Sequence, residues 1–469
     1  MEGPAHLPLL RIGSSAAGGR GVFATQPLKP GTEVFSERPA YHTTCAGKTP
    51  KQEGIEALAA HIVASHAPQH RNAIAALVSN VTELRKQPDL CEALADAVEH
   101  VRKAVELMPI DEALAIVSPT YADGVMHVPE AARTSVRESL VALAQNAVSE
   151  ESVWLSYGRD WSNAMWVNPG SACRLGSALY PQFGAVMNHS NNPNVYLIFD
   201  DDWLLRVRTI APVAAGEELC FSYVDLGQPY AELRAVLRKK YHFDCGEHDG
   251  RGGQRYVPGS SSGDDSRLAE LARTYGGAKP PCTEPAALIP AITAALQQRQ
   301  AAYDWLGIVV ASDDLLFCYR FTFRVVHPQV ALRLLSAGLA CQRLAPTDER
   351  ASRYLSQAVR VLGVTHGEFH PLATCARRAL EKCKAHLPGT PPSSRPGAAR
   401  SPAVLAADVA VGNVAAVHAF LAAPRLELDC SGLLVRRAVD DDGDGHSTYY
   451  MFTESSDFRL VSSSVSDKQ

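Results

Sequence analysis

The chain has 469 residues, which is too long for one compact core and predicts two or three domains. Hydrophobic residues make up 46% of it and charged residues 20%, as in ordinary globular proteins. The formal net charge of −5 gives no overall basic field, so we expect no direct binding to nucleic acid. No apolar run approaches the roughly 18 residues that predict a membrane span, so we expect no membrane association.

The cysteines indicate where the protein resides. There are eleven of them, scattered singly, and no pair has the C-x-x-C spacing typical of zinc ribbons and redox dithiols. The first residues lack the basic region of a secretory signal, and a proline interrupts their apolar run. An odd cysteine count without such a signal favours a reducing compartment. We therefore expect a cytoplasmic or nuclear protein, and a monomer.

The first half of the chain alternates between strand and helix patterns. Residues 8–45 show β-type alternation between Gly-containing turns, and residues 160–228 show it again. Between them, residues 50–150 are rich in Ala and Leu at helical spacing. This pattern predicts a strand-rich fold with a helical insertion. The clearest strands are Leu9–Ile12, Gly21–Ala24, Thr32–Ser36 and a hairpin of Val195–Phe199 with Trp203–Val207.

The second half is predicted to be helical. Residues 249–265 are rich in Gly, Ser and Asp and indicate a linker, and residues 266–386 return to helical spacing. A Pro- and Ser-rich stretch at 387–402 indicates a second linker. The remaining residues, 403–469, predict only a small and partly disordered tail.

Three motifs follow one another along the chain. Gly19-Arg20-Gly21 begins a strand, Asn188-His189-Ser190 follows an apolar segment, and a later strand ends at Tyr223. Glycine lets the backbone approach a ligand closely, and Asn and His side chains both donate and accept hydrogen bonds. Each motif alone also has an ordinary explanation: a hairpin turn with a surface arginine, an Asx turn before Pro193, and a half-buried core tyrosine.

In this order and at this spacing, the three motifs resemble the SET domain of protein lysine methyltransferases. The continuation Tyr241-His242-Phe243-Asp244-Cys245, which follows a basic helix, is similar to the SMYD branch of that family. The segment Val364–Leu372 is similar to a signature in the C-terminal helical domain of that branch. The resemblance implies an α+β chain: a SET domain over 1–248, with a post-SET segment at 229–248, and an all-α domain at 266–386 that resembles tetratricopeptide (TPR) repeats.

The resemblance also implies a reaction and a site. The methyl donor would be S-adenosyl-L-methionine, and the acceptor a lysine of a histone or another protein. A free lysine amine has a pKa of about 10.4, so an aromatic channel that desolvates it would favour the neutral nucleophile. Tyr223 and Tyr241 would flank this channel, Tyr223 being the more catalytic of the two. The implied cofactor contacts are Arg20, Asn163, Asn188, His189 and Phe243, with Asn80 as a weaker candidate.

The chain departs from the SMYD pattern in two places. After Cys45, where that pattern inserts a cysteine-rich MYND zinc module, the chain has no cysteine until Cys91. Asn191 stands where the post-SET zinc site takes its first cysteine, and Cys245 alone remains of the three that follow. A structural zinc ion needs four nitrogen or sulfur ligands. We therefore predict no bound metal and no MYND-type partner binding.

Two functions are consistent with the sequence. The first is an S-adenosylmethionine-dependent protein-lysine methyltransferase, indicated by the three motifs together. The alternative is a catalytically weak, SET-derived scaffold that binds partner peptides through residues 266–386, indicated by the degraded zinc ligands. A scaffold gives no reason to retain Asn188, His189 and Tyr223, so the sequence favours the enzyme.

Overall fold

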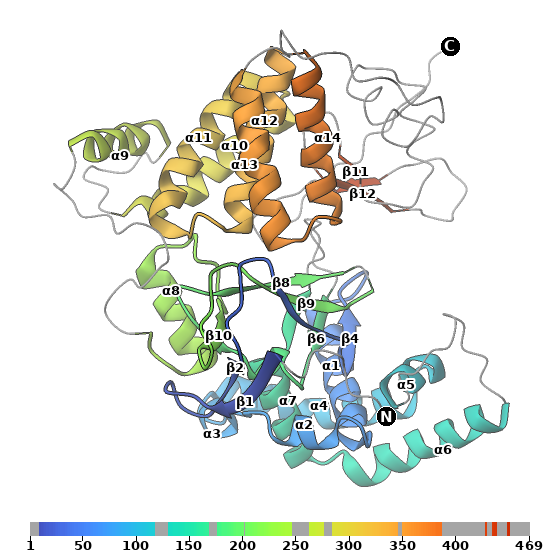
Figure 1. The fold of residues 1–469 in the computed structure, drawn as a ribbon. Helices are drawn as coiled ribbons and strands as arrows, with labels where there is room; N and C mark the ends of the chain where they lie inside the picture. The colour runs from blue at the N-terminus through green and yellow to red at the C-terminus, as the bar shows by residue number, and fades with distance from the viewer. Residues whose placement is uncertain are drawn as a thin grey trace.

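The computed structural model shows a strand-rich unit, a helical insertion beside it and a separate group of helices at the opposite end (Figure 1). Together these elements confirm the predicted α+β class. The predicted linker 387–402 and most of the tail 403–469 lie outside the described residues. The structure describes residues 9–117, 130–167, 176–200, 202–245, 262–275, 284–345 and 349–386, together with the short strands β11 (Glu427–Leu428), β12 (Leu434–Ala438) and β13 (Thr448–Tyr450).

One small sheet brings the three sequence motifs side by side. Its strand order is β1-β2-β10-β7, and β2 runs antiparallel to both β1 and β10. Strand β7 is parallel to β10, with Asn188 opposite Cys220 and His189 opposite Phe221. The Gly-Arg-Gly turn, the Asn-His pair and the approach to Tyr223 therefore share one surface. The strands are β1 (Leu10–Ser14), β2 (Arg20–Ala24), β7 (Asn188–His189) and β10 (Glu218–Phe221).

Two further three-stranded sheets complete the strand-rich unit. One has the order β3-β9-β8 and contains the predicted hairpin, and the other has the order β4-β6-β5. Val22, Phe35 and Leu219 are fully buried where the sheets pack together, which explains the alternation of apolar residues in the sequence. The strands are β3 (Glu33–Glu37), β4 (Tyr41–Thr44), β5 (Met165–Val167), β6 (Gly176–Leu179), β8 (Val195–Phe199) and β9 (Leu205–Thr209).

The helical insertion begins directly after β4. Thr49 caps the first helix in a capping box with Gln52, and a proline occupies its first position. Buried Tyr41 and Trp154 pack among the apolar residues of these helices, so the insertion has a core of its own. The helices are α1 (Pro50–His66), α2 (Arg71–Ala75), α3 (Val81–Leu84), α4 (Pro88–Glu106), α5 (Ile110–Val117), α6 (Glu130–Ala147) and α7 (Glu150–Asn163).

The C-terminal helices stack in sequence, each of α11 to α13 packing on the next. Helix α9 begins at Ser262, inside the predicted linker 249–265. The TPR-like character of this unit stays a prediction. No helix in the described ranges is long and apolar enough to cross a bilayer. The elements are α9 (Ser262–Tyr275), η4 (Pro285–Leu288), α10 (Ile289–Ala301), α11 (Trp305–Thr322), α12 (Pro328–Leu344), α13 (Glu349–Thr365) and α14 (Pro371–His386).

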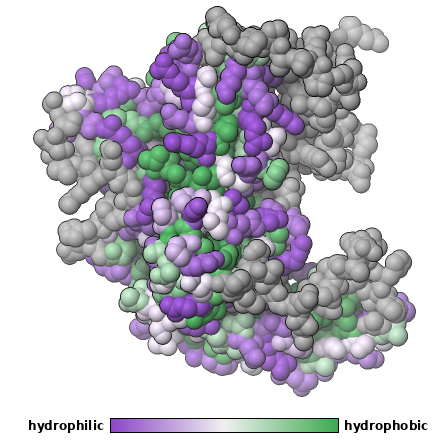
Figure 2. All heavy atoms as spheres, viewed as in Figure 1, coloured by the Kyte–Doolittle hydropathy of each residue, from purple (hydrophilic) through white to green (hydrophobic). Residues whose placement is uncertain are grey.

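The strand-rich unit and the C-terminal helices share a core. Helix α8 (Tyr230–Val236) and the π-helical turn η3 (Leu237–Tyr241) contribute fully buried Leu233 and Leu237 to the apolar cluster of the C-terminal helices. Arg208 of β9 also donates a hydrogen bond to the Val364 carbonyl of α13, at 3.2 Å. Figure 2 shows apolar residues along the middle of one face, over both units, with polar residues beside them. Because this core is shared, the C-terminal helices hold the segment that carries Tyr241.

Candidate active site

One cavity, which we call the motif cavity, collects every predicted site residue. Its volume is about 910 Å³, within the range that binds a nucleoside-sized ligand. The helical insertion contributes Asn80 and Asn163, strands β2 and β7 contribute Arg20, Asn188 and His189, and the segment after β10 contributes the rest. The predicted residues that line it are Arg20, Asn80, Asn163, Asn188, His189, Tyr223, Tyr241 and Phe243.

The glycine-rich turn opens the motif cavity. Gly18 and Gly19 have φ values of +97° and +69°, a left-handed conformation that favours glycine. Apart from the adjoining residues of the chain, no heavy atom lies within 4 Å of the position that a Cβ would take at either residue. Gly21 is the opposite case, because a Cβ there would lie 2.1 Å from Oε1 of Glu218. The turn therefore leaves space beside Gly18 and Gly19 and packs tightly at Gly21.

Asn188 is fixed by two hydrogen bonds. Its Nδ2 donates to the Arg20 carbonyl at 2.9 Å and to Oε1 of Glu218 at 2.6 Å. The amide group thus joins β7 to β2 and β10 across the sheet. Since its N–H groups are used within the protein, its oxygen is the atom that can accept a hydrogen bond from a ligand.

His189 is held as a neutral imidazole. Its Nδ1 accepts the backbone N–H of Tyr223 at 3.0 Å, so the proton is on Nε2, which donates to Oδ1 of Asn191 at 2.8 Å. Burial lowers the pKa of this histidine, in keeping with the neutral form. Its ring centroid lies 5.4 Å from that of Tyr223 and 5.7 Å from that of Phe243. His189 therefore positions Tyr223 through the backbone and takes part in an aromatic cluster.

Tyr223 and Tyr241 form an aromatic pair at the inner end of the motif cavity. Their ring centroids are 4.8 Å apart, and the Tyr223 hydroxyl donates to the Met187 carbonyl at 2.7 Å. Burial raises the pKa of Tyr223 well above its ordinary value and raises that of Tyr241 to about 12. Both side chains are therefore neutral phenols at physiological pH.

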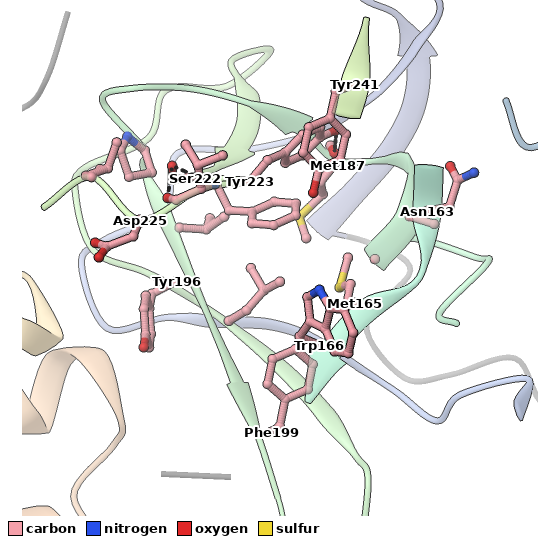
Figure 3. A pocket seen from close by; sticks show the side chains of 18 of the residues that line it. Asn163, Met165, Trp166, Met187, Tyr196, Phe199, Ser222, Tyr223, Asp225 and Tyr241 are labelled. Atoms are coloured by element: carbon pink, nitrogen blue, oxygen red, sulfur yellow. Dashed lines mark hydrogen bonds between the residues drawn. The ribbon is translucent and has the colours of Figure 1, made fainter. Parts of the chain in front are cut away.

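A second cavity is also lined by this tyrosine pair. It has a volume of about 440 Å³ and is walled by the strand-rich unit and by the C-terminal helices, so we call it the interdomain cavity. Figure 3 shows Tyr223, Met187, Met165 and Trp166 around it, with Tyr196 at one side. The residues that line both cavities are Ser162, Asn163, Ala185, Tyr223 and Tyr241.

Sequence reasoning missed most of the interdomain cavity. Met165 and Trp166 come from β5 and Tyr196 from β8, while Phe323 and His327 come from the end of α11 and the start of α12. None of these residues belongs to a motif, and apolar or aromatic residues in strands and helices usually indicate an ordinary core. Of the predicted site residues, Asn163, Tyr223 and Tyr241 line this cavity.

The two asparagines of the helical insertion support the wall of the motif cavity. Asn163 donates through Nδ2 to the carbonyl groups of Val78 and Arg159, at 2.8 and 2.7 Å. Asn80 has a left-handed φ of 48° and donates to the Ser162 hydroxyl at 3.0 Å. Arg20 donates to the Ala76 carbonyl at 2.9 Å. Each of these residues thus ties the helical insertion into the site.

The degraded zinc position has a different set of contacts. Asn191 is hydrogen-bonded to His189, and the Cys245 sulfur lies 3.5 Å from the Tyr230 hydroxyl. Within the described ranges, no three His, Cys, Asp or Glu side chains are grouped as metal ligands. Residues 246–261 lie outside those ranges, so the absence of zinc stays a prediction. At the expected MYND position, residues 45–49 connect β4 to α1.

Comparison with known proteins identifies the fold around these cavities. The SET domain family model matches residues 19–224, which contain all three motifs, so this part of the chain is a SET domain. Two relatives are matched over about half of this chain. Mouse "Histone-lysine N-methyltransferase SMYD3" is 23% identical over 50% of this chain and 59% of its own length. Chicken "N-lysine methyltransferase SMYD2" is 24% identical over 47% of this chain and 57% of its own length.

A longer match extends beyond the SET domain. Human "Histone-lysine N-methyltransferase SMYD3" is 21% identical over 80% of this chain and 97% of its own length. The chain is therefore similar to SMYD-type SET-domain proteins over most of its length, and the SET family uses S-adenosyl-L-methionine as its methyl donor. A solved SET domain, that of LSMT bound to lysine and AdoHcy, covers 81% of this chain and 88% of its own. Its identity is 13% and its TM-score 0.27, too low to support an argument.

Proposed function

We propose that this protein transfers a methyl group from S-adenosyl-L-methionine to the side-chain amine of a lysine in a protein substrate. One observation carries the proposal: two cavities share a wall that contains the partly buried tyrosine pair Tyr223 and Tyr241. Methyl transfer to an amine needs two reactants held in line from opposite sides of one narrow passage. Two cavities that share one aromatic wall would bring the two reactants to that wall from separate spaces.

The motif cavity suits the methyl donor. The open side of Gly18 and Gly19 leaves room for a ligand against the backbone, and the Asn188 oxygen is placed to accept from an ammonium group. The half-exposed Phe243 ring offers a face for a purine base, and Tyr223 and Tyr241 offer faces to a positively charged sulfonium. The bound donor would supply an electrophilic methyl group.

The interdomain cavity suits a lysine side chain. Its aromatic and thioether walls, including Trp166, Met165 and Phe199, can line an apolar stem, and such walls favour the neutral amine over an ammonium. Tyr223 and Tyr241 are neutral phenols, so they offer the amine hydrogen-bonding groups without a negative charge that would retain its proton. The protein's task is to orient the stem and to favour the neutral amine.

Binding measurements with matched variants test this proposal. Isothermal titration of S-adenosylmethionine is expected to give one site, which Asn188→Ala removes and Asn146→Ala retains. Asn146 is a suitable control because it is exposed on α6 and its amide bonds only to its own helix. Transfer of labelled methyl groups to lysine peptides, followed by identification of the modified lysine, then tests the reaction.

The alternative function is a catalytically weak scaffold. The degraded zinc position supports it, since Asn191 and Cys245 are tied to other side chains. If the folded protein does not bind S-adenosylmethionine, or binds it without transferring methyl groups, the scaffold is the better description. Partner binding by the C-terminal helices, a monomeric state, and a cytoplasmic or nuclear location remain predictions in either case.

A further inference from the structure

A lysine of the protein itself stands beside the shared tyrosine wall. Lys240 belongs to η3, directly before Tyr241, and lines the interdomain cavity. Its Nζ lies 5.1 Å from the ring centroid of Tyr241 and 5.7 Å from that of Trp161. The Tyr241 and Tyr223 centroids are 4.8 Å apart. The ammonium is therefore within about 10 Å of the Tyr223 ring, a distance over which charges in a partly buried site interact.

The charges around Lys240 come from several elements. Asp160 of α7 interacts with it electrostatically, but this carboxylate is only partly exposed, accepts from the Tyr41 hydroxyl and lines neither cavity. Asp225 follows β10 and lines the interdomain cavity itself. The other titratable groups nearby are Tyr157 and Arg159 of α7, Glu53 of α1 (through Asp160), Tyr241, and the exposed Arg238 and Lys239 of the same turn.

The interdomain cavity therefore has two charged groups in its lining, Lys240 and Asp225. Lys240 stacks on the wall where the substrate amine would react, whereas Asp225 lies near Tyr196, whose pKa its negative charge helps to raise. In Figure 3, Asp225 and Tyr196 lie to one side of the cavity, away from Tyr241. The cation is thus next to the reacting end and the anion is not.

We propose that Lys240 is an electrostatic residue of this site, whose positive charge favours the uncharged, nucleophilic form of the bound substrate lysine. A fixed cation disfavours a second cation close to it, and the effect is larger in a desolvated cavity than in water. This inference rests on the proposed methyl transfer and adds a residue that none of the SET-type motifs contains.

The step that Lys240 assists is the loss of a proton. The substrate ammonium releases one proton to water and keeps the electron pair on nitrogen. That pair then forms the new N–C bond while the S–C bond of the donor breaks, which leaves a neutral thioether. Lys240 exchanges no atoms in this sequence, so its effect depends only on charge and position.

The test is the pH profile of kcat with saturating lysine peptide and S-adenosylmethionine. Lys240→Met keeps the apolar stem and removes the charge, and it is expected to raise the apparent pKa of kcat by about one unit. At pH 7 this corresponds to roughly tenfold slower turnover, which disappears at high pH, while the peptide KM stays equal or falls. Lys240→Arg, which keeps the charge, is expected to retain the wild-type profile.

A second variant is expected to shift the apparent pKa of kcat in the opposite direction. Asp225→Asn removes the negative charge of the same cavity and is expected to lower the apparent pKa of kcat. An unchanged profile in Lys240→Met would overturn the proposal. A kcat of Lys240→Met that is lower by the same factor at every pH would also overturn the proposal, because it indicates only lost stacking on Tyr241 and Trp161. Absence of methyl transfer by the wild-type protein at every pH would instead contradict the proposed function itself.

Discussion

The motif cavity and the interdomain cavity share a tyrosine wall but are built in different ways. The motif cavity is formed largely by short segments with diagnostic sequences, such as Gly19-Arg20-Gly21 and Asn188-His189. The interdomain cavity is formed by ordinary strand and helix residues, among them Tyr196, Phe323 and His327, from units far apart in the chain. Groups that must approach a ligand closely need particular residue types, whereas an apolar wall can be built from many.

This difference leads to four predictions. The first two concern features common to both cavities, and the other two concern one cavity each.

Tyr223→Phe is expected to have the largest effect, because Tyr223 lines both cavities. It removes the hydroxyl that donates to the Met187 carbonyl and that the proposed function places beside the transferred methyl group. Methyl transfer is expected to fall by roughly 10²–10³-fold, the usual loss when one positioned polar group is removed from a reacting centre. The S-adenosylmethionine affinity should change little, and Tyr354→Phe in α13 provides the control. Unchanged turnover would contradict the role of Tyr223.

Leu237→Ala tests whether the two cavities depend on one core. Leu237 is fully buried in the cluster that joins η3 to the C-terminal helices. Removing its side chain is expected to reduce the free energy of unfolding by about 2–5 kcal/mol, measured with urea. Leu306→Ala, at a position 61% exposed on α11, should cost far less. Equal losses in both variants would mean that the shared core is not as tightly packed as the structure shows.

His327→Asn tests the interdomain cavity through pH. His327 is buried and caps α12 through Nδ1, and burial lowers its pKa to about 3. As the pH falls below about 6.5, this histidine becomes protonated in the unfolded chain but stays neutral in the folded protein. The free energy of unfolding therefore decreases as the pH falls. Asn keeps a capping acceptor and does not titrate. Between pH 7.5 and 5, the wild-type free energy of unfolding is expected to fall by about 2 kcal/mol more than that of the variant.

The other histidines whose pKa is lowered by burial are present in both proteins. The difference between the two curves of unfolding free energy against pH therefore isolates His327. Parallel curves would show that this side chain is not buried in the neutral form.

Gly21→Ala tests the motif cavity alone and should have the smallest effect. The added Cβ would lie 2.1 Å from Oε1 of Glu218 and 3.2 Å from Nδ2 of Asn188, so the carboxylate must move and its bond to Asn188 is disturbed. The S-adenosylmethionine affinity is expected to fall about tenfold, measured by calorimetry. The peptide KM should stay the same. Gly54→Ala, at a helix position with no atom within 4 Å of the new Cβ, is the control.

Much of the architecture could be predicted from local patterns. Alternating residues predicted the strands of the SET domain, and helical spacing predicted the insertion and the C-terminal helices, because these periodicities follow directly from backbone geometry. All the residues proposed for the site line one cavity, since their resemblance to the SET pattern carried their spatial arrangement with it. Their individual roles await the variants described above.

The pairing of distant surfaces was decided only in three dimensions. The sequence around Phe323 and His327 does not indicate that they line the same cavity as Met165. Such contacts depend on how the two units share a core. Lys240 belongs to the basic helix of the sequence, yet its ammonium lies over the ring of Tyr241 and lines the interdomain cavity. The sequence thus determined the elements and the motif residues, whereas only packing decided which charges and apolar walls the substrate would meet.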